Sequence, residues 1–300
     1  MTEGAAAERT LRWPTLLRLG RVSNLPTVWT NCLAGCVLAG ALPGNADVAG
    51  LLVSVSLFYV AGMFLNDAFD HERDGRERPE RPIPSGQVSA RSVLLMGLGL
   101  LGAGLMVLAL PMIRTGRADL RLMGGGVVLA GLIFYYDYSH HANPVAPTVM
   151  AACRAMIYVL AGIVAAPVFP ARLMAGAAVL FAYVIGLTYA AKQESLNRVQ
   201  NLWPLVLLGV PFAWAAPVLL DAGLGAVLYA GFLAWALLAL SLLVGRRKRN
   251  VPGAVVRLIA GISLLDAVLI AGVPGHEGLA LIAVVGFLLT LSLQRFIPGT

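Results

Sequence analysis

The chain has 300 residues, of which 59% are hydrophobic and only 12% are charged, and its mean hydropathy is +0.81. Soluble domains carry about a quarter charged residues, so this composition excludes an ordinary soluble fold and indicates an integral membrane protein. The formal net charge is +7. In a membrane protein, basic residues report the orientation of the chain first, so we expect no nucleic-acid partner.

Apolar stretches long enough to cross a bilayer occupy nearly the whole chain. A transmembrane helix needs about 20 apolar residues to cross ~30 Å of hydrocarbon. We predict an all-α, polytopic membrane helical bundle of nine or ten transmembrane helices, forming one domain over residues 1–300. The predicted spans are 24–42, 48–66, 91–112, 121–138, 145–167, 171–190, 203–220, 224–244, 254–272 and 278–295.

The orientation of the bundle is indicated by where the basic residues fall. Residues 1–22 lack a compact apolar core, so we expect a cytoplasmic N-terminal segment and no signal peptide. Basic residues gather there, between the second and third spans, after the sixth and after the eighth. If the spans alternate, these segments share one side, which the positive-inside rule places in the cytoplasm. We therefore expect a multi-pass protein of the inner or plasma membrane, contacting membrane lipids, with its active site facing the cytoplasm.

The stretch FLNDAFDHERDGRERPERPIPSG, residues 64–86, follows the second predicted span and carries most of the chemistry. If the helix continues, Asn66, Asp70 and Asp74 fall at i, i+4 and i+8 and share one face, with Asp67 beside it. Like charges at this spacing repel unless a cation offsets them. Carboxylate and amide oxygens are ligands that Mg²⁺ prefers, together with substrate phosphate oxygens. The pattern therefore favours a metal site that assists departure of a diphosphate leaving group.

Prolines and arginines complete this stretch. Pro79, Pro82 and Pro84 break the helix. We expect the chain to fold Arg78 and Arg81 back toward the carboxylates, where they could clamp the same phosphates. A solvated, charge-balanced loop is the alternative, and the spacing directly after a span favours the site.

Two segments resemble one protein family. Residues 66–86 resemble the first aspartate-rich motif of the UbiA-type intramembrane prenyltransferases, N-x-x-x-D-x-x-x-D followed by R-P-x-x-x-G. The upstream LGRVSNLPTVWTNCLAG, residues 19–35, resembles the first helix of that family, and the number of spans and the loop pattern also agree. The resemblance covers essentially the whole chain.

The resemblance implies a helical bundle around a central cavity open to the cytoplasmic side and to lipid. It also implies Mg²⁺-dependent transfer of a prenyl group from a prenyl diphosphate to a lipophilic acceptor, with an aromatic acceptor favoured. Asn66, Asp70 and Asp74 match the metal-binding positions of the family. Arg21 and Asn24 match polar positions at the start of its first helix.

The chain departs from the family in the segment after the sixth span. A second motif, D-x-x-x-D, is expected there, but the sequence reads TYAAKQESLNRVQNLWP. Its one acid, Glu194, is the candidate metal ligand, while Lys192 and Arg198 are candidates for contacting the diphosphate directly. Fixed positive charge would then replace metal charge. We favour retained catalysis over loss of the second metal.

The loop after the fourth span departs as well. The family often has a tyrosine followed by a lysine or arginine that reaches the diphosphate, and this chain has YYDYSHHANP. Tyr138, together with His140 or His141, is the candidate for these roles, because a protonated histidine can bind phosphate.

Arg154 and Asp266 are charges inside predicted spans. Such charges are costly and tend to mark functional or paired residues. Arg154 is a candidate cavity residue, or else a structural partner of Glu194 or Asp137. For Asp266 a structural role between helices is favoured over acceptor binding.

Two alternatives to a prenyltransferase stay open, and a third is disfavoured. A transporter could use Arg154 and Asp266 as coupling residues, although internal repeats that would support it are not evident. A non-catalytic relative could bind a prenyl lipid without turnover. Phosphatidyl transfer needs D-G-x-x-A-R, and DGRERP at residues 74–79 lacks the A-R pair.

Overall fold

The computed structural model describes residues 12–40, 46–115, 120–141, 143–166, 168–192, 203–220, 223–244, 250–297 and 299. All regular secondary structure within these ranges is helical. The α-helices are α1 (Trp13–Leu19), α2 (Leu25–Ala39), α3 (Ala46–Phe69), α4 (His71–Glu77), α5 (Ala90–Thr115), α6 (Leu120–Ser139), α7 (Ala146–Ala165), α8 (Ala171–Lys192), α9 (Val210–Ala215), α10 (Leu224–Val244), α11 (Val251–Ala271) and α12 (Glu277–Gln294). The 3₁₀ helices are η1 (Val22–Asn24), η2 (Trp203–Gly209) and η3 (Ala216–Leu220).

Eight helices in the described ranges are long and apolar enough to span a bilayer: α3, α5, α6, α7, α8, α10, α11 and α12. The predicted all-α, polytopic membrane fold is thus confirmed, whereas the count of nine or ten spans is not. The predicted span 24–42 is represented by α2, which has only 15 residues and is followed by Gly40 at φ 89°. The predicted span 203–220 is broken into η2, α9 and η3. Pro211 and Pro217 lie in it, and proline cannot donate an intrahelical hydrogen bond.

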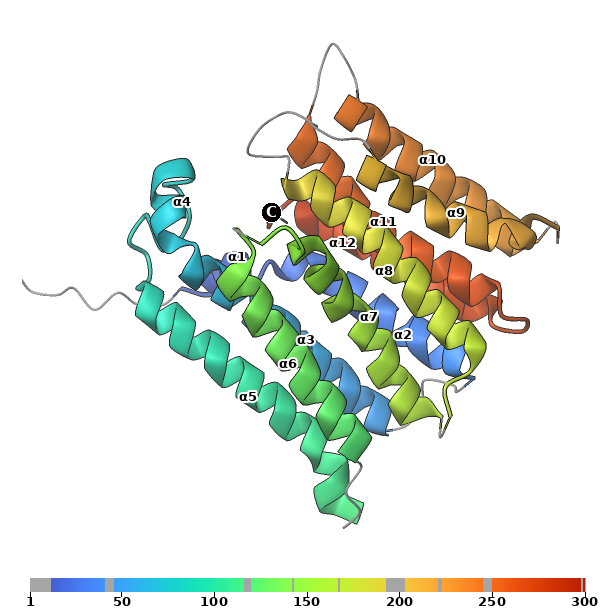
Figure 1. The fold of residues 1–300 in the computed structure, drawn as a ribbon, viewed down its shortest axis with the longest axis horizontal. Coiled ribbons are helices and arrows are strands. Elements are labelled where there is room, and N and C mark those ends of the chain that lie inside the picture. Colours follow the sequence, from blue (N-terminus) through green and yellow to red (C-terminus); the bar gives the residue numbers. More distant parts are fainter. Residues whose placement is uncertain are drawn as a thin grey trace, which may run out of the picture.

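The long helices run roughly side by side, and α4 stands apart beyond the end of α3 (Figure 1). Helix α3 packs on α5 and α6, and α7 packs on α2, α6 and α8. Helix α11 contacts α2, α8, α10 and α12 and is the most deeply buried of the spanning helices. The centre of the bundle is therefore built from α2, α3, α7, α8 and α11.

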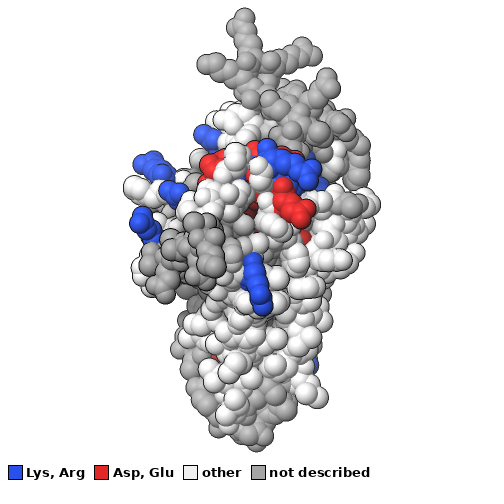
Figure 2. Space-filling model, turned by 90° about the vertical axis from the view of Figure 1, so that its left-hand side faces the viewer, with Lys and Arg blue, Asp and Glu red and all other residues white. Residues whose placement is uncertain are grey.

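The outer surface separates charge from apolar area. Figure 2 shows most of the charged side chains of one face gathered toward its upper end, above a mostly uncharged surface. Large apolar side chains such as Met106, Val227 and Leu237 are exposed on the spanning helices. Exposed apolar area of this extent is stable in contact with lipid. The chain is accordingly an integral, multi-pass membrane protein.

Helices α2 and α7 approach each other closely at Gly35. A Cβ added there would lie 2.7 Å from the Cβ of Ala161 and 3.0 Å from the Cα of Tyr158. Two backbones this close need a small residue at the contact, as is common between membrane helices. The contact fixes α7 against α2 beside the cavity described below.

Replacing Gly35 with Ala is expected to lower the apparent Tm. The added methyl group meets backbone atoms of α7, and overpacking of this kind costs about 1–3 kcal/mol, or roughly 2–4 °C of Tm for each kcal/mol. The matched control is Gly99→Ala in α5, because a Cβ there would have no neighbour within 4 Å. Thermal unfolding in detergent compares the two variants, and equal Tm values would contradict the expected strain.

Candidate active site

A cavity of about 650 Å³ lies between α2, α3, α6, α7, α8 and α11. This is the central cavity predicted for the bundle, and its volume is in the range of small-molecule sites. Acidic, basic and amide side chains line one part of it, among them Arg21, Asn66 and Asp70. Apolar side chains such as Phe58 and Ile157 line most of the rest. The cavity thus joins a charged region to an apolar one.

The C-terminal end of α3 supplies the acidic wall. The helix ends at Phe69, but the backbone N–H of Asp70 still bonds to Asn66 O at 2.9 Å, and that of Asp74 bonds to Asp70 O at 2.8 Å. The chain therefore keeps helical spacing into α4. As a result Asn66, Asp70 and Asp74 all line the cavity, and both carboxylates are buried.

Two arginines neutralise part of this wall. Arg21 Nη2 lies 2.8 Å from Asp67 Oδ1 and donates to Asn66 Oδ1 at 3.3 Å. Arg81 Nη1 lies 2.6 Å from Asp74 Oδ2 and 3.5 Å from Asp67 Oδ1. Asp67 is thus turned toward both guanidinium groups and, unlike Asn66 and Asp74, does not line the cavity. Its contacts are those of a residue that positions the arginines.

The backbone holds Arg21 in an unusual conformation. Its φ of 41° and ψ of 45° lie in the left-handed region, which non-glycine residues seldom adopt, and its carbonyl accepts a hydrogen bond from the Tyr59 hydroxyl at 3.2 Å. Burial alone would lower the pKa of Arg21, but Asp67 and the other acids nearby raise it above its ordinary value. The guanidinium is therefore a permanent positive charge.

The proline-rich segment folds Arg81 back over the carboxylates. The N–H of Ser85 bonds to Arg81 O at 2.9 Å, and the N–H of Gln87 bonds to Pro82 O at 3.0 Å. Gly86 has a φ of 76°, which only glycine adopts readily. Arg78 and Arg81 both line the cavity as a result.

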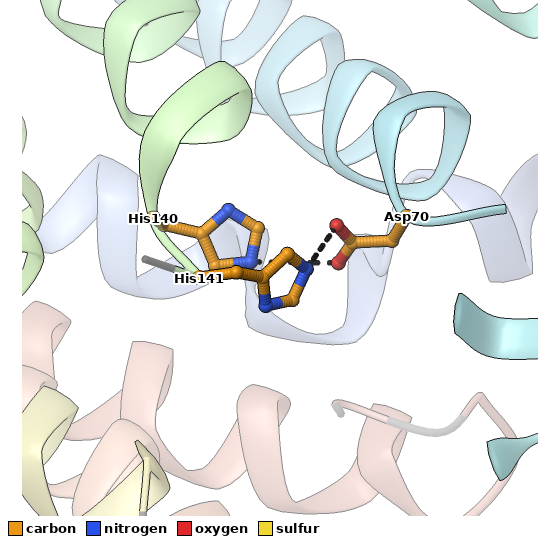
Figure 3. Close-up of side chains that lie close together, drawn as sticks. All are labelled: Asp70, His140 and His141. Atoms are coloured by element: carbon orange, nitrogen blue, oxygen red, sulfur yellow. Dashed lines mark hydrogen bonds and ion pairs between the residues drawn. The ribbon is translucent and has the colours of Figure 1, made fainter. Parts of the chain in front are cut away.

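Two histidines after α6 approach Asp70 from the same side (Figure 3). His141 Nε2 lies 2.6 Å from Asp70 Oδ1, and His140 Nε2 lies 3.5 Å from Asp70 Oδ2. Arg73 Nη1 contacts His141 Nδ1 at 2.6 Å. Burial raises the pKa of Asp70, but the hydrogen bonds and charges of the two imidazoles outweigh this effect and lower that pKa. Asp70 is therefore a carboxylate at neutral pH.

The structure places Tyr138 outside this group. Its side chain is 71% exposed and its ring lies against Phe69 and Phe134, away from the cavity. Helical geometry explains the difference, because residues four apart share a face and residues two apart do not. Tyr136, one turn before His140, stacks on that imidazole and lines the cavity instead.

Asp137 is a cavity residue that the sequence suggested only as a possible partner of Arg154. It lines the cavity, is only 3% exposed, and its Oδ2 has no hydrogen-bond partner among the described residues. The sequence could have indicated this role, because an acidic residue in the last turn of an apolar span tends to mark a functional site.

The remaining candidates occupy different surroundings. Asn24 lines the cavity, but its Nδ2 donates to Gly299 O at 2.8 Å and its Oδ1 accepts from Gln294 at 2.9 Å, so both ends of its amide are occupied. Lys192 lines the cavity and donates to Asn143 O at 2.9 Å.

Arg154 lies deeper in the wall and bonds to Asn31, not to Asp137. Glu194 and Arg198 lie outside the described residues.

The oxygen donors of the acidic wall suit a hard divalent cation. Asp70, Asp74 and Asn66 present two carboxylates and an amide to one space, and this is a donor set that Mg²⁺ accepts. Asp70 and the two imidazoles also bring three ligand atoms within 4.8 Å of one another, but imidazole nitrogen suits transition metals better than Mg²⁺, so the fit to Mg²⁺ rests on Asn66, Asp70 and Asp74. The donor chemistry therefore fits the metal that the sequence predicts.

Comparison with known proteins defines the class to which this fold and site belong. The sequence pattern of the UbiA prenyltransferase family matches residues 27–296. The chain belongs to this family. A search of curated protein sequences returned no match.

Solved structures show the same fold at low sequence identity. A digeranylgeranylglyceryl phosphate synthase is 17% identical with a TM-score of 0.58, and the alignment covers 88% of this chain and 98% of that one. A UbiA homologue from Archaeoglobus fulgidus, bound to DMAPP and Mg²⁺, is 12% identical with a TM-score of 0.52, covering 94% and 100%. A UbiA homologue from Aeropyrum pernix K1 is 14% identical with a TM-score of 0.50, covering 91% and 95%.

Proposed function

We propose that this protein transfers a prenyl group from a prenyl diphosphate to a lipophilic acceptor within the membrane, with Mg²⁺ assisting departure of the diphosphate. One observation carries the proposal: Asn66, Asp70 and Asp74 line the charged end of the cavity, with Arg78 and Arg81 in the same wall. The presence of DMAPP and Mg²⁺ in the A. fulgidus homologue supports this assignment.

At the charged end, the metal-binding side chains and the arginines would have different roles. Asn66, Asp70 and Asp74 would hold Mg²⁺, which supplies positive charge to the departing diphosphate oxygens. Arg78 and Arg81 would bind the same oxygens through charge-assisted hydrogen bonds.

Other basic groups surround the same space. Arg21, His140 and Lys192 line it and add donors, while Asp67 positions Arg21 and Arg81. Glu194 and Arg198 stay sequence predictions for a further metal ligand and a further phosphate contact.

The apolar end would receive the prenyl chain. Val55, Phe58, Ile157, Val184 and Ile259 line it. When the bond between the allylic carbon and the diphosphate oxygen breaks, the electron pair leaves with the diphosphate. An apolar wall keeps water from the allylic cation, so that the acceptor attacks it and afterwards releases a proton.

We infer that the charged end faces the cytoplasm. The inference rests on Arg12, just before α1, and on Arg18, Arg76 and Arg91, which lie in α1, in α4 and in the first turn of α5, because cytoplasmic segments carry the excess of arginine and lysine.

Metal removal tests the proposed function. The purified full-length protein is incubated in lipid nanodiscs with geranyl diphosphate, a membrane lipid extract as acceptor source, and Mg²⁺, and released diphosphate is measured. We expect release that falls to background in excess EDTA and returns with Mg²⁺. Diphosphate release that is unchanged by EDTA would refute a Mg²⁺-dependent prenyltransferase. So would release that never exceeds background with any divalent metal.

The same EDTA treatment should leave the apparent Tm nearly unchanged. Arg21 and Arg81 already pair with Asp67 and Asp74, so the carboxylates keep compensating charge when the metal is withdrawn. Thermal unfolding in EDTA and in Mg²⁺ provides this control and separates loss of chemistry from loss of fold.

A further inference from the structure

The two histidines after α6 form a group with Asp70 whose donor atoms differ from those of the oxygen-lined wall. Ligand atoms of Asp70, His140 and His141 lie within 4.8 Å of one another, and all three side chains line the cavity. Both rings lie beside the same carboxylate (Figure 3). The group therefore presents two imidazole nitrogens and a carboxylate to one space.

The hydrogen bond of His140 determines which of its ring nitrogens is free. Nδ1 lies 3.3 Å from the backbone oxygen of Asp137, and a carbonyl oxygen can only accept, so Nδ1 carries a hydrogen. In the neutral ring Nε2 then has a lone pair, and it lies 3.5 Å from Asp70 Oδ2. A histidine that binds a metal usually has this arrangement, with one ring nitrogen bonded to a carbonyl and the other free.

Two acceptors that face each other, as Nε2 of His140 and the Asp70 carboxylate do, need a cation between them. A proton on His140 would join that ring to Asp70 and leave His141 out. The two imidazole rings lie 3.9 Å apart between centres, so a proton on each would place two positive charges side by side. A metal ion instead binds both rings in their neutral form and uses all three groups at once.

His141 joins such a site after one rearrangement. Arginine only donates, so Arg73 Nη1 donates to His141 Nδ1 at 2.6 Å, and the ring hydrogen is on Nε2, 2.6 Å from Asp70 Oδ1. For Nε2 to bind a metal, this hydrogen must move to Nδ1 and Arg73 must withdraw. Both side chains have room to do so, since each is 42% exposed, and Arg73 has a second partner in Glu77 at 2.8 Å.

The ligand set indicates the kind of metal. Mg²⁺ is bound through oxygen, whereas imidazole nitrogen suits zinc, iron, copper and nickel. Two histidines and one carboxylate are the protein ligands of many catalytic zinc sites, in which a further position stays open. The same set with open positions also binds ferrous iron. The three side chains thus match a divalent transition metal ion.

We propose that Asp70, His140 and His141 bind a divalent first-row transition metal ion such as Zn²⁺, beside the oxygen ligands Asn66 and Asp74 that suit Mg²⁺. Asp70 would be common to the two ions. The open coordination positions would face the cavity that the three side chains line. A diphosphate oxygen would fill one of them, so that His140 acts on the diphosphate through the ion. This role toward the diphosphate rests on the proposed function, whereas the metal site itself does not.

Direct metal binding tests the proposal without any substrate. The full-length protein is purified in detergent, freed of metal with a chelator, and titrated with Zn²⁺ by calorimetry. The wild type is compared with His140→Gln, His141→Gln and His71→Gln. His71 is the matched control, because it follows Asp70 in the chain and has the same kind of hydrogen bond, from Nδ1 to Ala68 O at 2.9 Å, but does not line the cavity.

We expect the wild type to bind Zn²⁺, and His140→Gln and His141→Gln each to weaken that affinity by about 100-fold or more. Loss of a hydrogen bond to a metal ligand already costs about 10–100-fold, and here the ligand itself is lost. His71→Gln should match the wild type. Zn²⁺ should also raise the apparent Tm of the wild type and of His71→Gln, because it binds the folded state. If His140→Gln does not fold, His141→Gln decides the result, since its ring is partly exposed.

Three outcomes overturn the proposal. The wild type fails to bind Zn²⁺, or His140→Gln and His141→Gln bind it as the wild type does, or His71→Gln loses as much affinity as they do. Zn²⁺ binding through the two histidines, without release of diphosphate from geranyl diphosphate, would refute the proposed function and leave the metal site standing. Mg²⁺-dependent release by a protein that does not bind Zn²⁺ would refute the transition metal site alone.

Discussion

Replacement of Asp70 with Asn is expected to reduce Mg²⁺-dependent release of diphosphate by about 10²–10³-fold, the usual effect of losing one group that stabilises transition-state charge. The substitution keeps the size of the side chain and removes its charge. Asp70 lines the cavity and is the acid that both His140 and His141 approach. Its lowered pKa keeps it ionised throughout the neutral range, so the variant removes a full negative charge.

The control for this variant is Glu72→Gln, two residues further along the chain. Glu72 is exposed and does not line the cavity, so its replacement removes one acid from the same short helix without touching the site. Initial rates of diphosphate release at saturating geranyl diphosphate compare the two. Equal losses would mean that general charge, and not the position of Asp70, governs the reaction.

The largest expected loss of stability follows replacement of Arg81 with Met. Arg81 lies 2.6 Å from Asp74 and 3.5 Å from Asp67, and both acids are buried. Removing one partner of a buried ion pair leaves an uncompensated charge and costs about 3–5 kcal/mol, which corresponds to a fall in apparent Tm of roughly 10 °C. Diphosphate binding should weaken as well, because Arg81 lines the cavity.

Added Mg²⁺ distinguishes this charge effect from a packing defect. A divalent cation can compensate the carboxylate of Asp74, which lines the cavity and loses its partner in this variant, so the apparent Tm of Arg81→Met should rise with Mg²⁺ more than that of the wild type. Arg76→Met is the matched control, since Arg76 is exposed on α4. A Tm for Arg81→Met equal to that of the control would show that the ion pair contributes nothing to folding.

The fold could be predicted because membrane spans are a property of length and apolar content, which a sequence shows directly. The exceptions have local causes. Pro211 and Pro217 interrupt a stretch that is apolar enough to span, and α2 is shorter than the apolar run that contains it. Hydropathy alone registers neither feature.

The candidate site was predictable where it is local in sequence. Asn66, Asp70 and Asp74 come together because of their helical spacing. The proline-rich segment after them folds the chain back, which places Arg81 next to the carboxylates. Tyr138 was predicted from its place beside the histidines in the sequence, without regard to which face of the helix it occupies. The structure has Tyr136 on the cavity side of α6 instead.

The network around Arg154 could not be read from the sequence. Its partner Asn31 lies on α2 and Asp266 on α11, and only the packing of three helices brings these side chains into contact.

The pairing of carboxylates with arginines has a consequence for the order of events. A metal that arrives alone must displace Arg81 from Asp74, and a diphosphate that arrives alone must compete with the same carboxylates for the guanidinium. If both bind as proposed, the counterions would exchange partners: Asp70 and Asp74 would hold the metal, and Arg78 and Arg81 would bind the phosphates. Each then strengthens the binding of the other by the same factor, so the protein is expected to take up its metal as part of the substrate complex and to release both together.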